Sequence, residues 1–313
     1  MRTCFTVCVS TWLVCPGVGQ AQKSDLPSDA AEGMRHLYDG DADRAIAFFR
    51  RLQLHQPERP LGYLLETNAL WWKLYCEQCE IQWGFIDAWK RPKLPEDNVY
   101  FALADKAISL AETGLKQRET AEMHLYAGMG WALQARLYGL RDDRQGTARA
   151  GVKAREHFLR AIKLDPEMAD AYTGLGLYNY YVDTLSPLLK LLRFLFGIPG
   201  GSKKEGIRQL ELAMEKGQLT AVEARFYLAK NLRNYDLQYE RAVEVLLPLV
   251  AQHPGNAVFQ LLLGNLYAKL GRNDQAAAHY RAAQGANRSH AACALRIQQI
   301  SEAAVKALRG SGL

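Results

Sequence analysis

The sequence predicts an all-α fold in which antiparallel helix pairs stack into a solenoid. The main observation is a set of small and bulky residues at regular spacing near the C-terminus: Gly264, Tyr267, Gly271, Ala276, Tyr280 and Ala283. The same frame lies about 34 residues earlier, at Ala242, Leu246, Leu249 and Pro254. Of the 313 residues, 49% are hydrophobic, which suffices for a continuous core. A helix pair repeated at a fixed period cannot bury its apolar face alone, so it must stack on its copies.

Residues 1–21 differ from the rest of the chain and predict a secretory signal peptide. Arg2 is the only charged residue before Lys23, and the segment between them is mostly apolar or small. Gly19 and Ala21 occupy the −3 and −1 positions of a cleavage site. The alternative is a buried N-terminal helix of a cytosolic protein. Because the segment has the features of a signal peptide, we expect an exported protein that resides in the periplasm or cell envelope.

The remainder, residues 22–313, is expected to be a single solenoid of six helix pairs and a capping helix. The pairs are expected at about 28–57, 58–117, 118–166, 167–218, 219–254 and 255–289, with the capping helix at 290–309. In the first pair, Gly33 and Phe49 stand in the repeat frame, and Pro57 stops the second helix because it lacks an N–H. The capping helix covers the apolar face that the last pair exposes.

The middle pairs depart from the regular frame. The second pair has a long first helix, then the stiff connector 91–95 with two prolines. The third resumes the frame at Gly128 and Phe158. In the fourth, the frame breaks between residues 183 and 201 and restarts at Ser202, where Glu205 completes a capping box. The fifth pair starts at a second capping box, Thr220 with Glu223, and the sixth near residue 256.

These residues resemble the tetratricopeptide repeat family, and the long helices and insertions suggest an exported bacterial variant of it. The resemblance spans nearly all of the mature chain. It implies a right-handed superhelix of antiparallel helix pairs that binds proteins or peptides along its concave face. Family membership identifies no particular partner.

Two aromatic clusters are the candidate partner-binding residues. The first is Trp71, Trp72 and Tyr75, and the second is Tyr178, Asn179, Tyr180 and Tyr181. Aromatic side chains bury large areas and also form hot spots at interfaces. The competing interpretation for each ring is packing between repeats.

The insertion at residues 185–199 is unusually apolar for its position. Lys190 and Arg193 fall on one side of a helix, and the rest of its surface includes Leu188, Leu191, Phe194 and Phe196. Such a segment suits contact with anionic lipid or with a partner's groove. The alternative is a plug folded back onto the protein's own solenoid, because an exposed patch of this kind invites aggregation.

Cys76 and Cys79 form a Cys-x-x-Cys motif within a helical stretch. Redox activity needs a thiol of lowered pKa, usually at a helix start after a strand, and Glu77 beside it acts in the opposite direction. We therefore interpret the pair as two small core residues that can form a local disulfide outside the cytosol. With signal cleavage the chain keeps these two cysteines and Cys293, and this odd number predicts no disulfide framework.

Basic residues are concentrated between Arg136 and Lys163, which indicates a solvated helix face, or else an acidic partner or lipid headgroup. The sequence shows no catalytic or metal-binding motif and suggests no cofactor and no nucleic-acid partner. Taken together, it predicts a non-catalytic repeat scaffold that binds a protein or peptide at the cell envelope. The alternatives are a peripheral membrane adaptor using residues 185–199 and a Cys-x-x-Cys redox protein.

Overall fold

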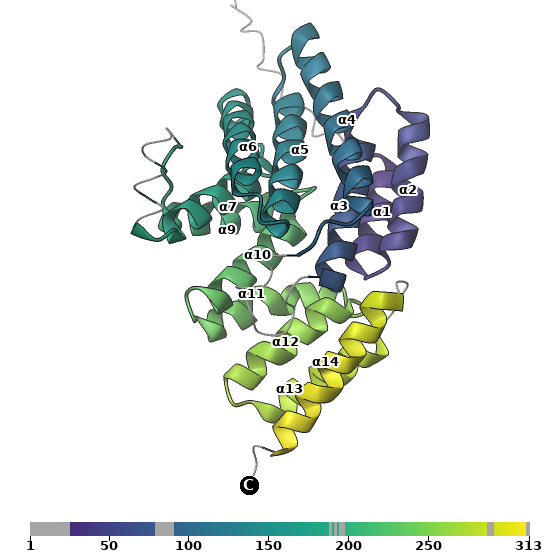
Figure 1. The fold of residues 1–313 in the computed structure, drawn as a ribbon, viewed down its shortest axis with the longest axis vertical. Coiled ribbons are helices and arrows are strands. Elements are labelled where there is room, and N and C mark those ends of the chain that lie inside the picture. The colour runs from purple at the N-terminus through teal and green to yellow at the C-terminus, as the bar shows by residue number, and fades with distance from the viewer. Residues whose placement is uncertain are drawn as a thin grey trace, which may run out of the picture.

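The computed structural model describes residues 26–78, 91–187, 190, 193, 198–286 and 291–310. Within these ranges the chain forms thirteen helices and no strand (Figure 1). In chain order they are α1 (Ser28–Tyr38), α2 (Ala42–His55), α3 (Pro60–Gln78), α4 (Glu96–Gln117), α5 (Ala121–Leu140), α6 (Arg144–Leu164), α7 (Ala171–Thr184), α9 (Lys203–Lys216), α10 (Ala221–Asn234), α11 (Tyr239–Gln252), α12 (Ala257–Lys269), α13 (Asn273–Gly285) and α14 (Ala291–Gly310). The predicted all-α fold is confirmed.

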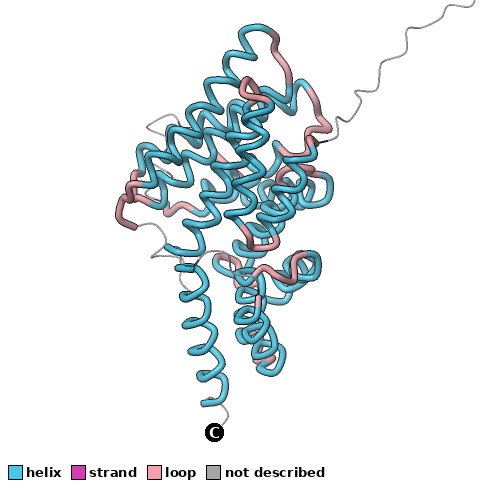
Figure 2. The backbone as a smooth tube through the Cα atoms, turned by 90° about the vertical axis from the view of Figure 1, so that its right-hand side faces the viewer, coloured by secondary structure: helices cyan, strands magenta, loops and turns pink. Residues whose placement is uncertain are grey.

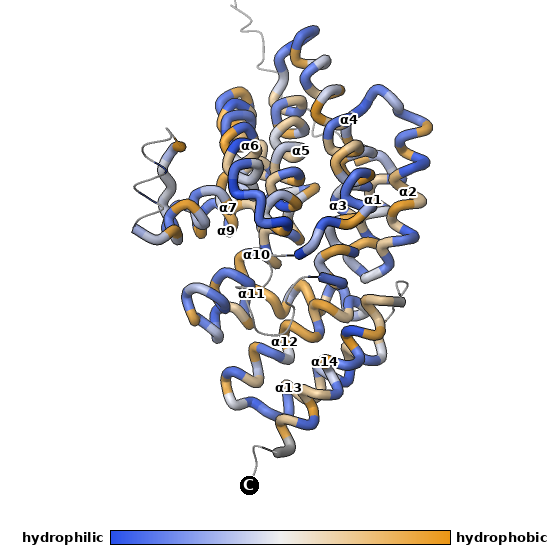
Figure 3. The backbone as a smooth tube through the Cα atoms, in the orientation of Figure 1, coloured by the Kyte–Doolittle hydropathy of each residue, from blue (hydrophilic) through white to orange (hydrophobic). Residues whose placement is uncertain are grey.

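The helices pack as sequential pairs. The most extensive contacts join helices that follow one another in the chain, such as α5 with α6, α7 with α9 and α12 with α13. The first helices of successive pairs, α3, α5, α7 and α10, also contact one another and form an inner layer. The outer helices show alternating polar and apolar residues in Figure 3, as expected for helices with one buried side.

The regularly spaced small and bulky residues hold each pair together. A Cβ atom added to Gly33 would lie 2.3 Å from the ring of Phe49, and one added to Gly264 would lie 2.8 Å from the ring of Tyr280. Both rings are almost completely buried. The glycines are required because the two helix backbones approach too closely for a larger residue.

Side chains at the helix starts agree with the sequence in one place and differ in another. The Ser202 hydroxyl accepts a hydrogen bond from the N–H of Glu205 at 3.4 Å, so α9 begins as predicted. Thr220 does not cap α10. Its hydroxyl instead bonds the carboxylate of Asp170 at 3.0 Å, because that buried carboxylate competes for it. Glu223 is therefore free for the different role described below.

The coil turns far enough for its first helices to meet its last. Helix α3 contacts α14, although the two helices lie more than 200 residues apart in the sequence. Two residues that are bonded between them are 217 positions apart. Figure 1 places the lower ends of α1 and α3 against α12 and α14. Helix α14 packs against α13 and α12 as well as α3, and it runs on to the C-terminal end of the chain in Figure 2. Among the described helices, none combines the length and apolar character needed to cross a bilayer.

Candidate functional site

The centre of the inner layer is occupied by a buried ion pair. Arg136 of α5 bonds Glu223 of α10 at 2.6 Å, and Asn68 of α3 accepts a second, longer bond from the same guanidinium at 3.4 Å. Burial acts to lower the pKa of Arg136, but the charge and hydrogen bond of Glu223, together with the neighbouring Tyr227 and Tyr100, raise that pKa overall. Three helices that are distant in sequence thus share one buried charge pair, which no spacing in the sequence indicates.

Trp71 belongs to this centre. Its indole N–H donates to the hydroxyl of Tyr227 at 2.9 Å. The guanidinium of Arg136 lies 5.1 Å from the centroid of the Tyr227 ring and 5.9 Å from that of Trp71. These are cation–π distances, so the two rings add to the stabilisation of the buried cation.

The other two residues of the first aromatic cluster are also interior. The Trp72 ring packs edge-on against Phe226 at a centroid distance of 4.8 Å, and Tyr75 is 1% exposed. We expected Trp71, Trp72 and Tyr75 to bind a partner. The structure corrects this expectation, because the last repeats cover all three side chains and give them a packing role.

Polar bonds join the first pair to the last two. The Asp39 carboxylate lies 2.8 Å from Nδ1 of His253, and the side-chain amide of Asn256 donates to the carbonyl of Tyr38 at 2.9 Å. These contacts link the α1–α2 turn to the α11–α12 turn. We call this junction, together with the disulfide described next, the closure.

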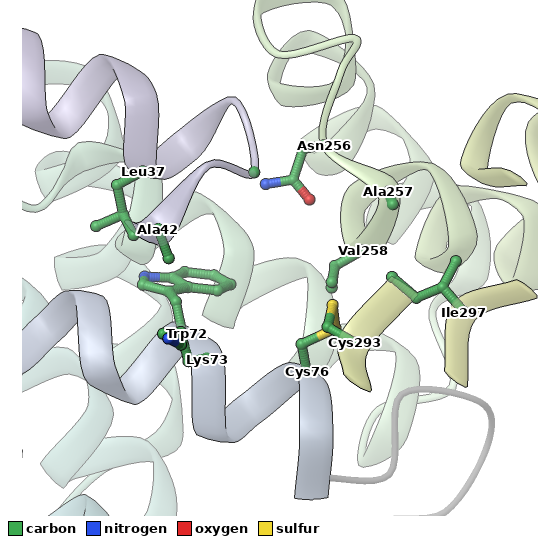
Figure 4. A pocket seen from close by; sticks show the side chains of 11 residues that line it. Leu37, Ala42, Trp72, Lys73, Cys76, Asn256, Ala257, Val258, Cys293 and Ile297 are labelled. Carbon is green, nitrogen blue, oxygen red and sulfur yellow. A yellow bond between two sulfur atoms is a disulfide. The ribbon is translucent and has the colours of Figure 1, made fainter. Parts of the chain in front are cut away.

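Cys76 of α3 forms a disulfide with Cys293 of α14; their Cα atoms are 5.4 Å apart, and the two residues are 217 positions apart in the sequence (Figure 4). Arg296 also donates to the carbonyl of Cys76 at 2.9 Å. The predicted disulfide between Cys76 and Cys79 is therefore wrong in this structure, as is the expectation that no disulfide holds the fold. Cys79 itself lies outside the described residues. A cavity of about 50 Å³ lies beside the disulfide and is lined partly by Trp72.

The second aromatic cluster is only partly buried. Tyr180 is buried, and its hydroxyl donates to Asp236 at 2.9 Å. Tyr178, Asn179 and Tyr181 remain partly exposed. Each makes a polar contact, with the carbonyl of Pro199, with Gln209 and with Asn231 respectively. Of the predicted partner-binding residues, these three are the ones whose side chains keep exposed surface.

The insertion is described only at a few positions. Leu188, Leu191, Phe194 and Phe196 lie outside the described residues. Lys190 forms a salt bridge with Asp183 at 3.0 Å. Arg193 donates to the carbonyl of Ile198 at 3.1 Å. Both predicted membrane-facing cations are thus bonded to the protein itself.

A small titratable cluster lies between α5 and α6. The Nδ1 atoms of His124 and His157 are 3.0 Å apart, and Glu119 contacts both His124 and Arg160. Burial, followed by the positive neighbours His124 and Lys153, lowers the pKa of His157 to about 4. The cluster holds no nucleophile, and no metal-binding group of His, Cys, Asp or Glu occurs among the described residues.

Residues 73–251 match the family model described as Regulator of microtubule dynamics protein 1-3. The chain belongs to this family. Residues 257–290 match a tetratricopeptide repeat model, which confirms the resemblance seen in the sequence. Both families consist generally of non-catalytic scaffolds, and the repeat is a protein-binding module. No curated protein matches the sequence of this chain.

Solved structures of repeat proteins are similar to the chain at low identity. MamA is 19% identical, with a TM-score of 0.41 over 62% of this chain and 95% of that chain. YrrB, titled a TPR protein with an unusual peptide-binding site, is 18% identical, with a TM-score of 0.37 over 80% of this chain and 97% of that one. A monomeric IFIT1 mutant with Gppp-AAAA is 17% identical, with a TM-score of 0.43 over 90% of this chain and 63% of that one.

Proposed function

We propose that the protein is an exported, non-catalytic repeat scaffold that binds a protein or peptide partner at a bacterial cell envelope. The repeat architecture supports the binding role. The disulfide between Cys76 and Cys293 carries the export part of the proposal. Disulfides form and persist in oxidising compartments and are rare in the cytosol. The signal-like residues 1–21 point to the same compartment.

The family name refers to microtubule dynamics, which suggests a different location. A chain that acts on a cytosolic filament remains in a reducing compartment, where the Cys76–Cys293 bond does not persist. A fusion of residues 1–40 to a reporter that is active only after export distinguishes the two proposed locations. We expect reporter activity and a mature N-terminus at Gln22. An uncleaved, inactive fusion refutes export and favours a cytosolic role.

The partner-binding surface is proposed at Tyr178, Asn179 and Tyr181, beside the base of the insertion. The inner layer is filled by the protein's own side chains, whereas these three keep exposed area. The test is affinity capture from envelope extract with the wild type and Tyr178→Ala. Tyr63→Ala is a matched control, because Tyr63 is also partly exposed and also donates to a proline carbonyl, that of Pro57.

We expect Tyr178→Ala to lose the captured partner and Tyr63→Ala to keep it, with both variants folded by circular dichroism. Equal capture by both variants refutes this surface. The membrane alternative is not developed further, because the described cations of the insertion, Lys190 and Arg193, are already bonded within the protein.

A further inference from the structure

The structure divides the basic residues between Arg136 and Lys163 into two groups. The first group is neutralised within the protein. Arg141 is buried and bonds Asp97 at 2.6 Å, as Arg136 bonds Glu223. Arg144 and Arg160 pair with carboxylates near the two ends of α6, Asp142 and Glu119. All four cations are therefore paired with carboxylates of the protein itself before any partner binds.

The second group consists of Arg149, Lys153, Arg155 and Lys163, which have no carboxylate partner among the described residues. All four lie on α6, whose sequence carries six Arg or Lys and a single acid, Glu156. The helix is therefore strongly positive along its length, and its second cation group remains unneutralised.

Three of these cations share one exposed face. Arg149, Lys153 and Lys163 are exposed. At 100° per residue, their spacing of four and fourteen positions places them within roughly 80° of one another around the helix. Glu156 shares the face and removes only part of its charge. We call Arg149, Lys153 and Lys163 the α6 basic strip.

Apolar and aromatic groups accompany the strip. Leu159 and Leu164 are among the exposed large hydrophobic side chains, at 37% and 41% exposure. Nζ of Lys153 lies 5.3 Å from the Trp131 ring, and the Arg155 guanidinium lies 5.4 Å from the Tyr178 ring. Cations held over rings beside exposed leucines resemble the composition of protein interfaces more than that of a merely solvated helix.

We infer that the outer face of α6 docks an acidic, leucine-containing segment of a partner protein. This inference rests on the proposed function, because it names the chemistry of the partner and one surface that holds it. The strip extends roughly 21 Å along the helix, at 1.5 Å per residue. An extended segment of about seven residues covers that length. Arg155, on another side of the same helix, lies over the ring of Tyr178, so α6 is adjacent to one of the proposed partner-binding residues.

The test is fluorescence anisotropy with a labelled peptide of about twelve residues that repeats Glu-Glu-Leu, sized from this span. The variant reverses the strip with Arg149→Glu, Lys153→Glu and Lys163→Glu. The matched control changes the net charge equally at exposed residues of α9, α13 and α14, with Lys204→Glu, Arg281→Glu and Lys306→Glu. Circular dichroism checks that both fold.

We expect the strip variant to bind the peptide at least about tenfold more weakly and the control to stay within about twofold. Added salt should weaken wild-type binding. Leu159→Ser should weaken the Glu-Glu-Leu peptide and leave an all-glutamate peptide unchanged. If the charge-reversed protein fails to fold, Arg149→Ala with Lys163→Ala replaces it, with an expected loss of about threefold.

Equal weakening by the strip variant and its control overturns the inference, because net charge alone then explains binding. Absence of wild-type binding also overturns it, as does strip-dependent binding of phosphatidylglycerol vesicles without peptide binding. If the strip variant still captures the envelope partner, the surface is wrong and the scaffold function stands. If no protein form captures a partner, the scaffold function itself fails.

Discussion

Breaking the disulfide of the closure should cost a large share of the stability. Cys293→Ser removes a cross-link between residues 217 positions apart. In the chain-entropy model, a loop of this length destabilises the unfolded state by roughly 5 kcal/mol, and native disulfides are typically worth about 2–5 kcal/mol. The bonds from Asp39 to His253 and from Asn256 to Tyr38 remain in the variant. We therefore expect a loss of about 3–5 kcal/mol in the free energy of unfolding.

Urea unfolding followed by circular dichroism measures this loss. With a denaturant slope of about 3 kcal/mol per molar, the midpoint should fall by about 1–1.7 M. Wild type with reductant should match Cys293→Ser, and reductant should not change the variant further. Cys79→Ser is the control and should leave the midpoint unchanged. A wild-type midpoint that is the same with and without reductant refutes the reasoning.

Three further predictions concern packing, charge and pH. Gly264→Ala should cost about 1–3 kcal/mol, because its Cβ would lie 2.8 Å from the Tyr280 ring, whereas Gly151→Ala, which meets open space, should stabilise by about 0.5–1 kcal/mol; equal melting temperatures would contradict this. Arg136→Ala should cost about 3–5 kcal/mol because it leaves Glu223 buried and unpaired. Adding Glu223→Ala should cost less than the sum of the single changes, and additive losses would argue against the ion pair. His157 has a pKa of about 4 when folded and about 6.5 when unfolded, so the unfolded state binds more protons between these values. Stability from this site is therefore present above pH 6.5 and is lost as the pH falls toward 4. His157→Gln should flatten urea midpoints over that range, and an unchanged slope would exclude the residue as the cause.

Much of the helix packing could be predicted because the repeat frame encodes contacts between neighbours. Gly33 with Phe49 and Gly264 with Tyr280 are small and bulky residues that meet within one pair. Their separation is short, so their spacing alone specifies which residue faces which. The cap at Ser202 is predictable for the same reason, since both bonded groups lie within one turn.

The closure could not be predicted, because it depends on how small rotations between repeats accumulate over the whole coil. Irregular pairs change those rotations, and α4 alone has 22 residues. Cys76 therefore had a nearby partner in sequence, Cys79, and a distant one in space, Cys293. Once the ends meet, Trp72 and Tyr75 become interior residues. An aromatic pattern looks the same in an open groove as in a filled one.

The candidate site shows the same limit. The density of positive charge between residues 136 and 163 is visible in the sequence, but the carboxylates that neutralise Arg136 and Arg141 come from distant helices. Glu223 has the spacing of a capping residue and serves instead as the partner of Arg136. Only the folded arrangement shows which cations remain for a partner.

The central claim is that the first and last repeats are joined into a closed coil outside the cytosol. Peptide mapping of the exported protein, alkylated without reduction and digested with Glu-C, tests it most directly. Cleavage after Glu77 separates Cys76 from Cys79 unless they are bonded to each other. We predict a linked peptide pair containing Cys76 and Cys293, with Cys79 alkylated. A bond between Cys76 and Cys79, or alkylation of Cys76 and Cys293, contradicts the closed coil.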